Sequence, residues 1–178
     1  MKSLLLILLM LFPFFASEND KMKMRWSETK KLTWNDFKGT PSGSNDYVAS
    51  TNSGISFSYS YRTRNGETKF DYTVQSNFYP ELSWYRPTLV SDYILQHEQT
   101  HFDISELFAR MLRKQLAQLD AAAADKETVD ALYQQIELAR REMQYQYDRE
   151  SEHSKNKEVE LQWRAYIANE LQAYARWK

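Results

Sequence analysis

The sequence predicts an α+β fold, in which a small antiparallel sheet is followed by three helices. Two observations in the first half and one in the second support this class. Apolar residues alternate with serines over residues 55–63, which is the period of a half-buried strand. Asn65-Gly66 follows directly and is the strongest short signal for a hairpin turn. From about residue 91 onward the apolar residues recur at helical spacing.

The first half also contains shorter candidate elements. Residues 32–34 are a candidate strand, and residues 47–51 are a second extended segment. Residues 35–46, between them, are dense in Gly, Pro, Ser and Asn, which is the composition of a loop. The return strand of the hairpin is predicted over residues 68–78, where aromatic and β-branched residues share one face.

The second half is predicted to form three helices, at about residues 91–119, 127–152 and 157–177. Ser91 or Asp92 can cap the first of them. The alanine-rich stretch 120–127 is expected to be a tight connection rather than a linker. We therefore expect one domain over residues 18–178.

The composition supports a folded domain and excludes several functions. The chain of 178 residues is 42% hydrophobic and 15% aromatic, which is enough for a core. The formal net charge of -1 gives no field that would favour nucleic acid. The chain has no cysteine, so disulfides, thiolate zinc sites and a cysteine nucleophile are excluded.

The N-terminus resembles a secretory signal peptide. Met1-Lys2 is followed by an apolar stretch at residues 3–15, which is short for a bilayer span and is interrupted by Pro13. Small residues follow at Ala16 and Ser17. We predict a signal peptide at residues 1–17 and export to the periplasm or the medium, without stable membrane insertion of the mature domain. The alternative is an uncleaved N-terminal anchor.

The chemistry centres on the stretch ILQHEQTHFDI, which contains His-Glu-x-x-His. On a helix, His97 and His101 lie about 40° apart in projection and one turn apart in height, so both imidazoles can bind one metal ion. Glu98 borders the same face. Zinc lowers the pKa of a bound water, and a carboxylate there can take a proton and pass it to a leaving amine. The spacing predicts a zinc peptidase site; the alternative is a solvated polar patch on an amphipathic helix.

The same helix does not supply a third zinc ligand. Asp103 and Glu106 are rotated from His101 by about 200° and about 140°, so both face away from the histidine pair. If the first two predicted helices pack antiparallel about their connection, His97 and His101 lie opposite residues near 147 of the second helix. The third ligand is therefore expected on the second helix.

Two residues of the second helix could complete the site. Asp148 falls at the height of the histidine pair, and His153 lies about a turn and a half further along. We favour His153, the only other histidine, with Asp148 orienting a ligand histidine. The reverse assignment is the main alternative, and His153 could instead favour the helix C-terminus as an imidazolium. Tyr147 or Tyr145 could stabilise an oxyanion, although packed or surface tyrosines are more common.

Several segments together resemble a known family. LTWNDFKG, Ser83-Trp84, LQHEQTHFDI and YDRESEH are similar to the bacterial family catalogued as domain of unknown function 922, over about residues 30–170. The resemblance implies a secreted, zincin-like metallopeptidase, with its helix motif matched at residues 97–104. The family's later Tyr-Asp-x-x-Thr-x-His-Gly segment is matched by Tyr147, Asp148 and His153. Ser151 replaces the usual Thr, and Ser154 stands where Gly is common, at the backbone turn after His153.

The sequence thus predicts an exported zinc metallopeptidase that acts on a peptide or protein substrate. His97, His101 and His153 are the expected ligands, and Glu98 is the general base and then acid. Two alternatives remain. One is a zinc-stabilised envelope binding or assembly module without turnover, and the other is an amidase that acts on a cell-wall peptide.

Overall fold

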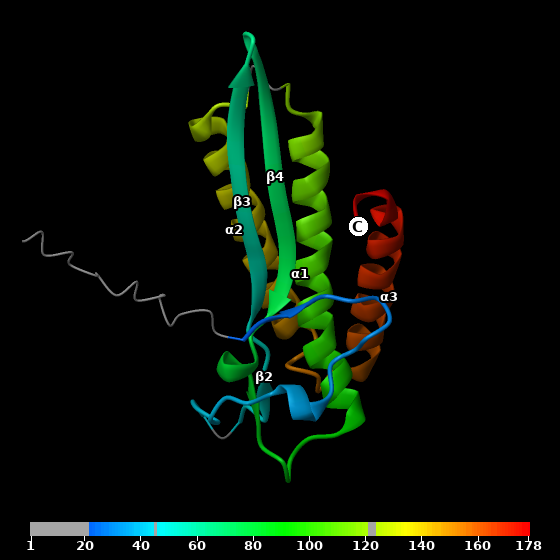
Figure 1. The fold of residues 1–178 in the computed structure, drawn as a ribbon. Helices are drawn as coiled ribbons and strands as arrows, with labels where there is room; N and C mark the ends of the chain where they lie inside the picture. Colours follow the sequence, from blue (N-terminus) through cyan, green and yellow to red (C-terminus); the bar gives the residue numbers. More distant parts are fainter. Residues whose placement is uncertain (1–21, 45, 121–123) are drawn as a thin grey trace, which may run out of the picture.

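The computed structural model describes residues 22–44, 46–120 and 124–178, and its strands precede its helices as predicted (Figure 1). The strands are β1 (Met24–Arg25), β2 (Ala49–Ser50), β3 (Ser53–Arg64), β4 (Glu67–Phe78) and β5 (Trp84–Tyr85). The helices are α1 (Asp92–Gln118), α2 (Lys126–Glu150) and α3 (Lys157–Ala173), with 3-10 turns at Trp34–Asp36, Pro80–Leu82 and Ala175–Trp177. The α+β class is confirmed. The predicted signal peptide, residues 1–17, and part of the predicted connection at 120–127 lie outside the described residues.

The hairpin of β3 and β4 follows the predicted pattern. The two strands pair antiparallel over their full lengths, and Arg64 and Glu67 close the ladder around a two-residue turn. Asn65 has φ 53° and Gly66 has φ 82°, and positive φ at both central residues is the requirement of a type I′ turn. The apolar face of the hairpin packs against the helices and joins the main core.

Two short segments of the first half differ from the prediction. The predicted strand at residues 32–34 is wrong, because a 3-10 turn begins at Trp34. The Asp36 carboxylate accepts hydrogen bonds from the backbone N–H and the hydroxyl of Thr33, at 2.7 and 2.8 Å, which folds the chain back on itself. The predicted extended segment at residues 47–51 is reduced to β2, which pairs antiparallel with β5.

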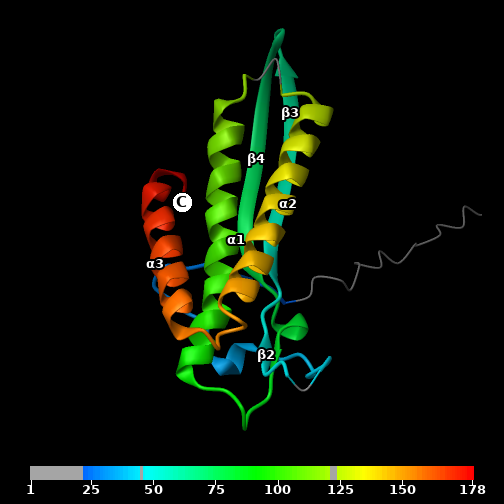
Figure 2. The ribbon, with the colours of Figure 1, turned by 180° about the vertical axis from the view of Figure 1, so that it is seen from behind.

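Helix α1 is the central element of the molecule. It contacts β3 and β4, α2 and α3 (Figures 1 and 2). Ser91 caps it by accepting a hydrogen bond from the backbone N–H of Ile94. The chain reverses between α1 and α2, which therefore pack antiparallel, as the prediction of the site requires.

The core has an apolar and a polar part along α1. Ile104, Leu107, Leu112 and Leu116 are buried in the main hydrophobic cluster. Toward the N-terminus of α1, most of the buried side chains are polar instead, and these include both histidines of the motif. Across the described ranges, no helix is long and apolar enough to cross a membrane. The zincin-like character of the helical region stays a prediction.

Candidate metal centre

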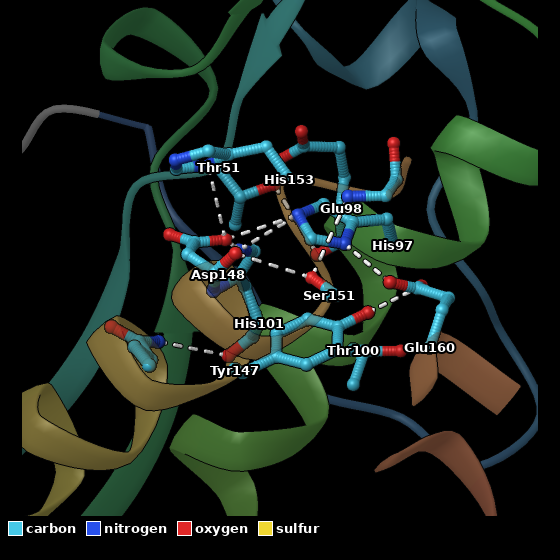
Figure 3. A network of polar contacts seen from close by, with 12 residues as sticks. Thr51, His97, Glu98, Thr100, His101, Tyr147, Asp148, Ser151, His153 and Glu160 are labelled. Atoms are coloured by element: carbon cyan, nitrogen blue, oxygen red, sulfur yellow. Dashed lines mark hydrogen bonds and ion pairs between the residues drawn. The ribbon is translucent and has the colours of Figure 1, made fainter. Parts of the chain in front are cut away.

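The two histidines of the motif converge on one point beside α1. His97 and His101 are buried, and their Nε2 atoms lie 3.3 Å apart (Figure 3). One helical turn separates them, so the convergence follows directly from the four-residue spacing. Two imidazole nitrogens so placed can bind one ion.

Asp148 of α2 completes a three-residue group. Its Oδ1 lies 3.1 Å from Nε2 of His97 and 2.9 Å from Nε2 of His101 (Figure 3). The candidate ligand atoms of the three residues all lie within 4.8 Å of one another. Burial opposes ionisation of Asp148, but His101 and His97 outweigh it and lower the pKa of its carboxyl. Two imidazoles and an ionised carboxylate form a donor set that zinc accepts. We call these residues the His–His–Asp group.

His153 lies beside this group, just beyond the end of α2. Its Nδ1 is 3.7 Å from Oδ1 of Asp148, and its side chain is 48% exposed. Glu152, His153 and Ser154 all have positive φ, between 51° and 69°, and this left-handed run turns the chain back toward Asp148. The geometry favours Asp148, the alternative ligand of the sequence analysis, because its carboxylate contacts both histidines of the pair. His153 as a ligand stays a prediction.

Glu98, the predicted general base, is a buried residue of the motif. It is only 4% exposed, and among the described residues its Oε2 has no hydrogen-bond partner. A buried polar atom without a partner is costly and calls for an explanation. Glu98 lines a cavity of about 450 Å³ together with the His–His–Asp group. A bound ion with its water would give this oxygen the partner that it lacks, so the residues present fit a metal.

Glu160 of α3 also contacts the site, and the sequence did not predict this. It is 0% exposed, and its Oε2 lies 2.9 Å from Nδ1 of His97, on the side of the ring opposite Asp148 (Figure 3). Arg164 donates to Oε1 of Glu160 from Nε at 2.8 Å. Burial opposes ionisation, but His97, Tyr147 and Arg164 lower the pKa of Glu160 to about 2. A carboxylate on the second nitrogen of a ligand histidine fixes the ring and its tautomer.

Tyr147 packs beneath the two imidazoles. Its ring stacks on His97 at a centroid distance of 4.6 Å and meets His101 edge-on at 5.2 Å. It is fully buried, and its hydroxyl donates a 2.5 Å hydrogen bond to Glu160. This position favours a role in holding His97 and Glu160 over the predicted oxyanion role. Tyr145, the other candidate, lines the cavity and is 66% exposed.

The carboxylates of Asp148 and Glu160, which both contact His97, determine the charge of this imidazole in the metal-free protein. Burial opposes protonation of this imidazole, but hydrogen bonds to Asp148 and Glu160 outweigh it and raise its pKa from 6.5 to about 9. A proton therefore occupies His97 at neutral pH when no ion is bound. Metal ligands must be deprotonated, so an ion would displace this proton.

The acidic neighbours that helix geometry excluded do face elsewhere. Asp103 accepts hydrogen bonds from Nε1 of Trp26 at 2.6 Å and from Gln99 at 2.9 Å. Glu106 accepts one from Nε of Arg110 at 2.9 Å. Neither belongs to the group around His97 and His101.

The fold and the site define an α+β protein whose central helix carries a buried His-Glu-x-x-His motif, met by a carboxylate from a second helix. The chain matches the model of one family over residues 29–154, which is more than half of its length. It belongs to this family, described as bacterial protein of unknown function (DUF922). No curated protein and no solved structure matches it. The matched region contains the His–His–Asp group, Glu98 and His153 but ends before Glu160, and the expected resemblance extended further, to about residue 170.

Proposed function

We propose that the protein is an exported zinc-dependent metallopeptidase that hydrolyses peptide bonds. The observation that carries this proposal is the convergence of His97, His101 and Asp148 beside a buried Glu98 whose Oε2 lacks a partner. A site that served only to stabilise the fold would have no need of this fourth residue. Glu98 lines the same cavity as the proposed ligands.

The His–His–Asp group would hold the ion, and His153 lies at its edge. A bound zinc ion supplies Lewis acidity and lowers the pKa of water to about 7. Glu160 and Tyr147 fix the ring of His97 from behind, so that its Nε2 faces the ion site. This support holds the imidazole of His97 from within the protein.

Glu98 would perform the proton transfers of hydrolysis. The attacking water must lose one proton, and the leaving amine must gain one. In this proposal, Oε2 of Glu98 takes the first proton and delivers it to the amine nitrogen. Because this oxygen is buried, little bulk water competes for its proton.

Strand β2 offers an edge on which an extended peptide could lie. The backbone N–H of Arg86 donates to the carbonyl of Val48 at 2.8 Å, so residues 48 and 86 form a hydrogen-bonded pair across β2 and β5. In an antiparallel pair, hydrogen-bonded and non-hydrogen-bonded residue pairs alternate, so the backbone N–H and C=O groups of the next residue, Ala49, point away from β5. Residues 46–51 line the cavity, so this edge borders the proposed site. Strand addition here would hold a peptide in extended form.

Export rests on the N-terminal sequence. Residues 1–17 combine a lysine, an apolar stretch and small residues in the order of a secretory signal. Substrates would then be peptides or proteins outside the cytoplasm. Fractionation of cells that express the full-length chain tests this directly, because retention in the cytoplasm would contradict it.

Zinc content and peptide cleavage, measured on the same preparations, test the enzymatic proposal. We expect the full-length chain to bind one zinc ion and to cleave members of a broad peptide library. Glu98→Gln should keep the zinc and lose roughly 10²- to 10⁴-fold in kcat, the usual range for a general base. Glu142→Gln, an exposed glutamate of α2, is the matched control and should change neither property.

The outcomes separate the peptidase from its alternative. Stoichiometric zinc with no cleavage of any peptide would overturn the peptidase and favour a binding or assembly module. Cleavage that persists in Glu98→Gln would overturn the role of this residue.

A further inference from the structure

The cavity beside the His–His–Asp group has one strongly basic residue at its rim. Of the described residues that line it, Arg141 is the only arginine or lysine. It lies on α2, and its side chain is 60% exposed. The cavity thus pairs a metal-binding end with a separate cationic position.

The charge of Arg141 is only weakly compensated by its neighbours. Among the described residues, the carboxylate within ion-pair distance of Arg141 is that of Glu137, at 3.8 Å from Nε of Arg141. Glu137 is already held by Arg140, which donates to its two oxygens from Nε and Nη2 at 2.9 and 2.8 Å. One carboxylate therefore faces two guanidinium groups. The guanidinium group of Arg141 therefore has N–H donors that can bind the carboxylate of a ligand.

Helix geometry gives the separation between the two ends of the cavity. Arg141, Gln144, Tyr145 and Asp148 line it from one face of α2, at the spacing of successive turns. Seven residues from Arg141 to Asp148 correspond to about 10 Å along the helix axis. An extended peptide rises about 3.3 Å per residue, so this length matches about three residues of substrate.

Two tyrosines of the cavity lining suit contact with a peptide chain. Tyr145 is largely exposed and Tyr47 is half exposed, and both line the cavity. Tyrosine side chains give broad contact at low cost in conformational entropy. Tyr47 also meets the ring of His153 edge-on at 5.2 Å, which connects this wall with the proposed metal centre.

On the basis of the proposed function, we infer that Arg141 binds a carboxylate of the substrate about three residues from the cleaved bond. The preferred substrates are therefore acidic peptides. The carboxylate can belong to an aspartate or glutamate side chain or to the C-terminus of the peptide. Both sources offer the same two oxygens to the guanidinium group.

Peptide binding to the zinc-loaded Glu98→Gln protein tests this inference without requiring turnover. One peptide series carries a single Glu at successive positions with an amidated C-terminus, and a matched series carries Gln. A third arm compares free and amidated C-termini on the neutral peptide. Fluorescence anisotropy gives the dissociation constants.

We expect at least one acidic peptide to bind roughly tenfold or more tightly than its neutral match, the usual range for a hydrogen bond to a charged group. Adding Arg141→Gln should abolish this preference and leave the binding of neutral peptides within about twofold. The matched control is Arg149→Gln, an exposed arginine of α2 outside the cavity lining, which should preserve the preference.

Equal binding of acidic and neutral peptides, or a preference that survives Arg141→Gln, would overturn the inference. Cleavage by the unmodified protein, measured in parallel, keeps the two proposals apart. Equal cleavage of both series contradicts only the role of Arg141. A preference in binding without any cleavage contradicts only the peptidase.

Discussion

Glu160 shows how much of the proposed centre depends on a residue without direct access to the ion. Its Oε2 meets Nδ1 of His97, and its Oε1 receives hydrogen bonds from Tyr147 and Arg164. The carboxylate is therefore held on both oxygens before it positions the histidine. This arrangement extends the proposed site from α1 and α2 to α3.

Glu160→Gln should weaken zinc binding by roughly 10- to 100-fold, the usual cost of losing a carboxylate behind a ligand histidine. The amide keeps the shape of the side chain but removes the charge that supports His97. Competition with a fluorescent zinc chelator measures the change.

Glu158→Gln, on the exposed surface of the same helix, should leave the affinity unchanged. If Glu160→Gln also leaves it unchanged, Glu160 does not support His97. Urea unfolding of the zinc-free variant shows whether the substitution has disturbed the fold instead.

The sequence predicted the part of the site that local spacing encodes. The four-residue interval placed His97 and His101 together, and the antiparallel pairing of two helices brought Asp148 into range as the alternative third ligand. No residue spacing or motif in the sequence indicates that Glu160 belongs to the site. Its only local mark is Arg164 four residues later, which is the pattern of an ordinary surface ion pair. Its burial depends on how α3 is rotated against α1, and this is a tertiary property.

At the scale of elements, the connection from α2 to α3 determines where the last histidine lies. Ser151 is fully buried at the end of α2, and the backbone N–H of Asn156 donates to its carbonyl at 2.9 Å. Between them, three residues other than glycine have positive φ. A left-handed conformation costs such residues about 1–2 kcal/mol each, so this turn is strained.

Ser154→Gly should therefore raise the free energy of unfolding. Ser154 has φ 69°, a conformation that glycine adopts without the steric penalty. The greater freedom of glycine in the unfolded chain offsets part of this gain, which leaves about 0.5–1 kcal/mol. The midpoint of urea unfolding measures the change.

Ser42→Gly, at an exposed loop serine without positive φ, is the control and should not stabilise the protein. An unchanged or lower midpoint for Ser154→Gly would show that the turn stores no such strain.

The other elements differ in how far their sequence determined them. The hairpin was predictable because strand alternation and the Asn65-Gly66 turn favour the same structure. The strand expected at residues 32–34 does not form, because the backbone N–H of Thr33 donates a hydrogen bond to the carboxylate of Asp36. A pattern of apolar residues does not indicate this hydrogen bond. Strand β2 pairs with β5 over only two residues, and this pairing joins segments far apart in the sequence, so local sequence patterns do not determine its length.

At the scale of the whole molecule, the polar centre lies within the same packed structure as the core. Helix α1 carries the buried apolar residues along one part of its length and the proposed metal centre along another. Protonation of the centre is therefore coupled to folding. In the metal-free protein, His97 has a pKa of about 9, compared with 6.5 in an unfolded chain.

The metal-free protein should therefore lose stability as the pH rises. Because folding raises the pKa of His97, its contribution is fully present below pH 6.5 and is lost as the pH rises through about 9. Asp148 and Glu160 have lowered pKa values, so both remain ionised over this window. Urea unfolding in EDTA at several pH values between 6 and 9.5 measures the decline.

His97→Gln should abolish most of this decline, because the variant lacks the titrating imidazole. Saturating zinc should also abolish it, since the ion takes the place of the proton. A flat stability profile of the unmodified protein in EDTA would contradict the close contacts between His97 and its two carboxylates.

The position of a bound zinc ion tests the central claim most directly. Crystals of the zinc-loaded full-length chain, measured at the zinc absorption edge, locate the ion by its anomalous signal. We predict one peak at about 2.0–2.2 Å from Nε2 of His97, Nε2 of His101 and a carboxylate oxygen of Asp148. No peak between the two histidines, or a peak held by His153 with Asp148 beyond bonding distance, would contradict the proposed centre.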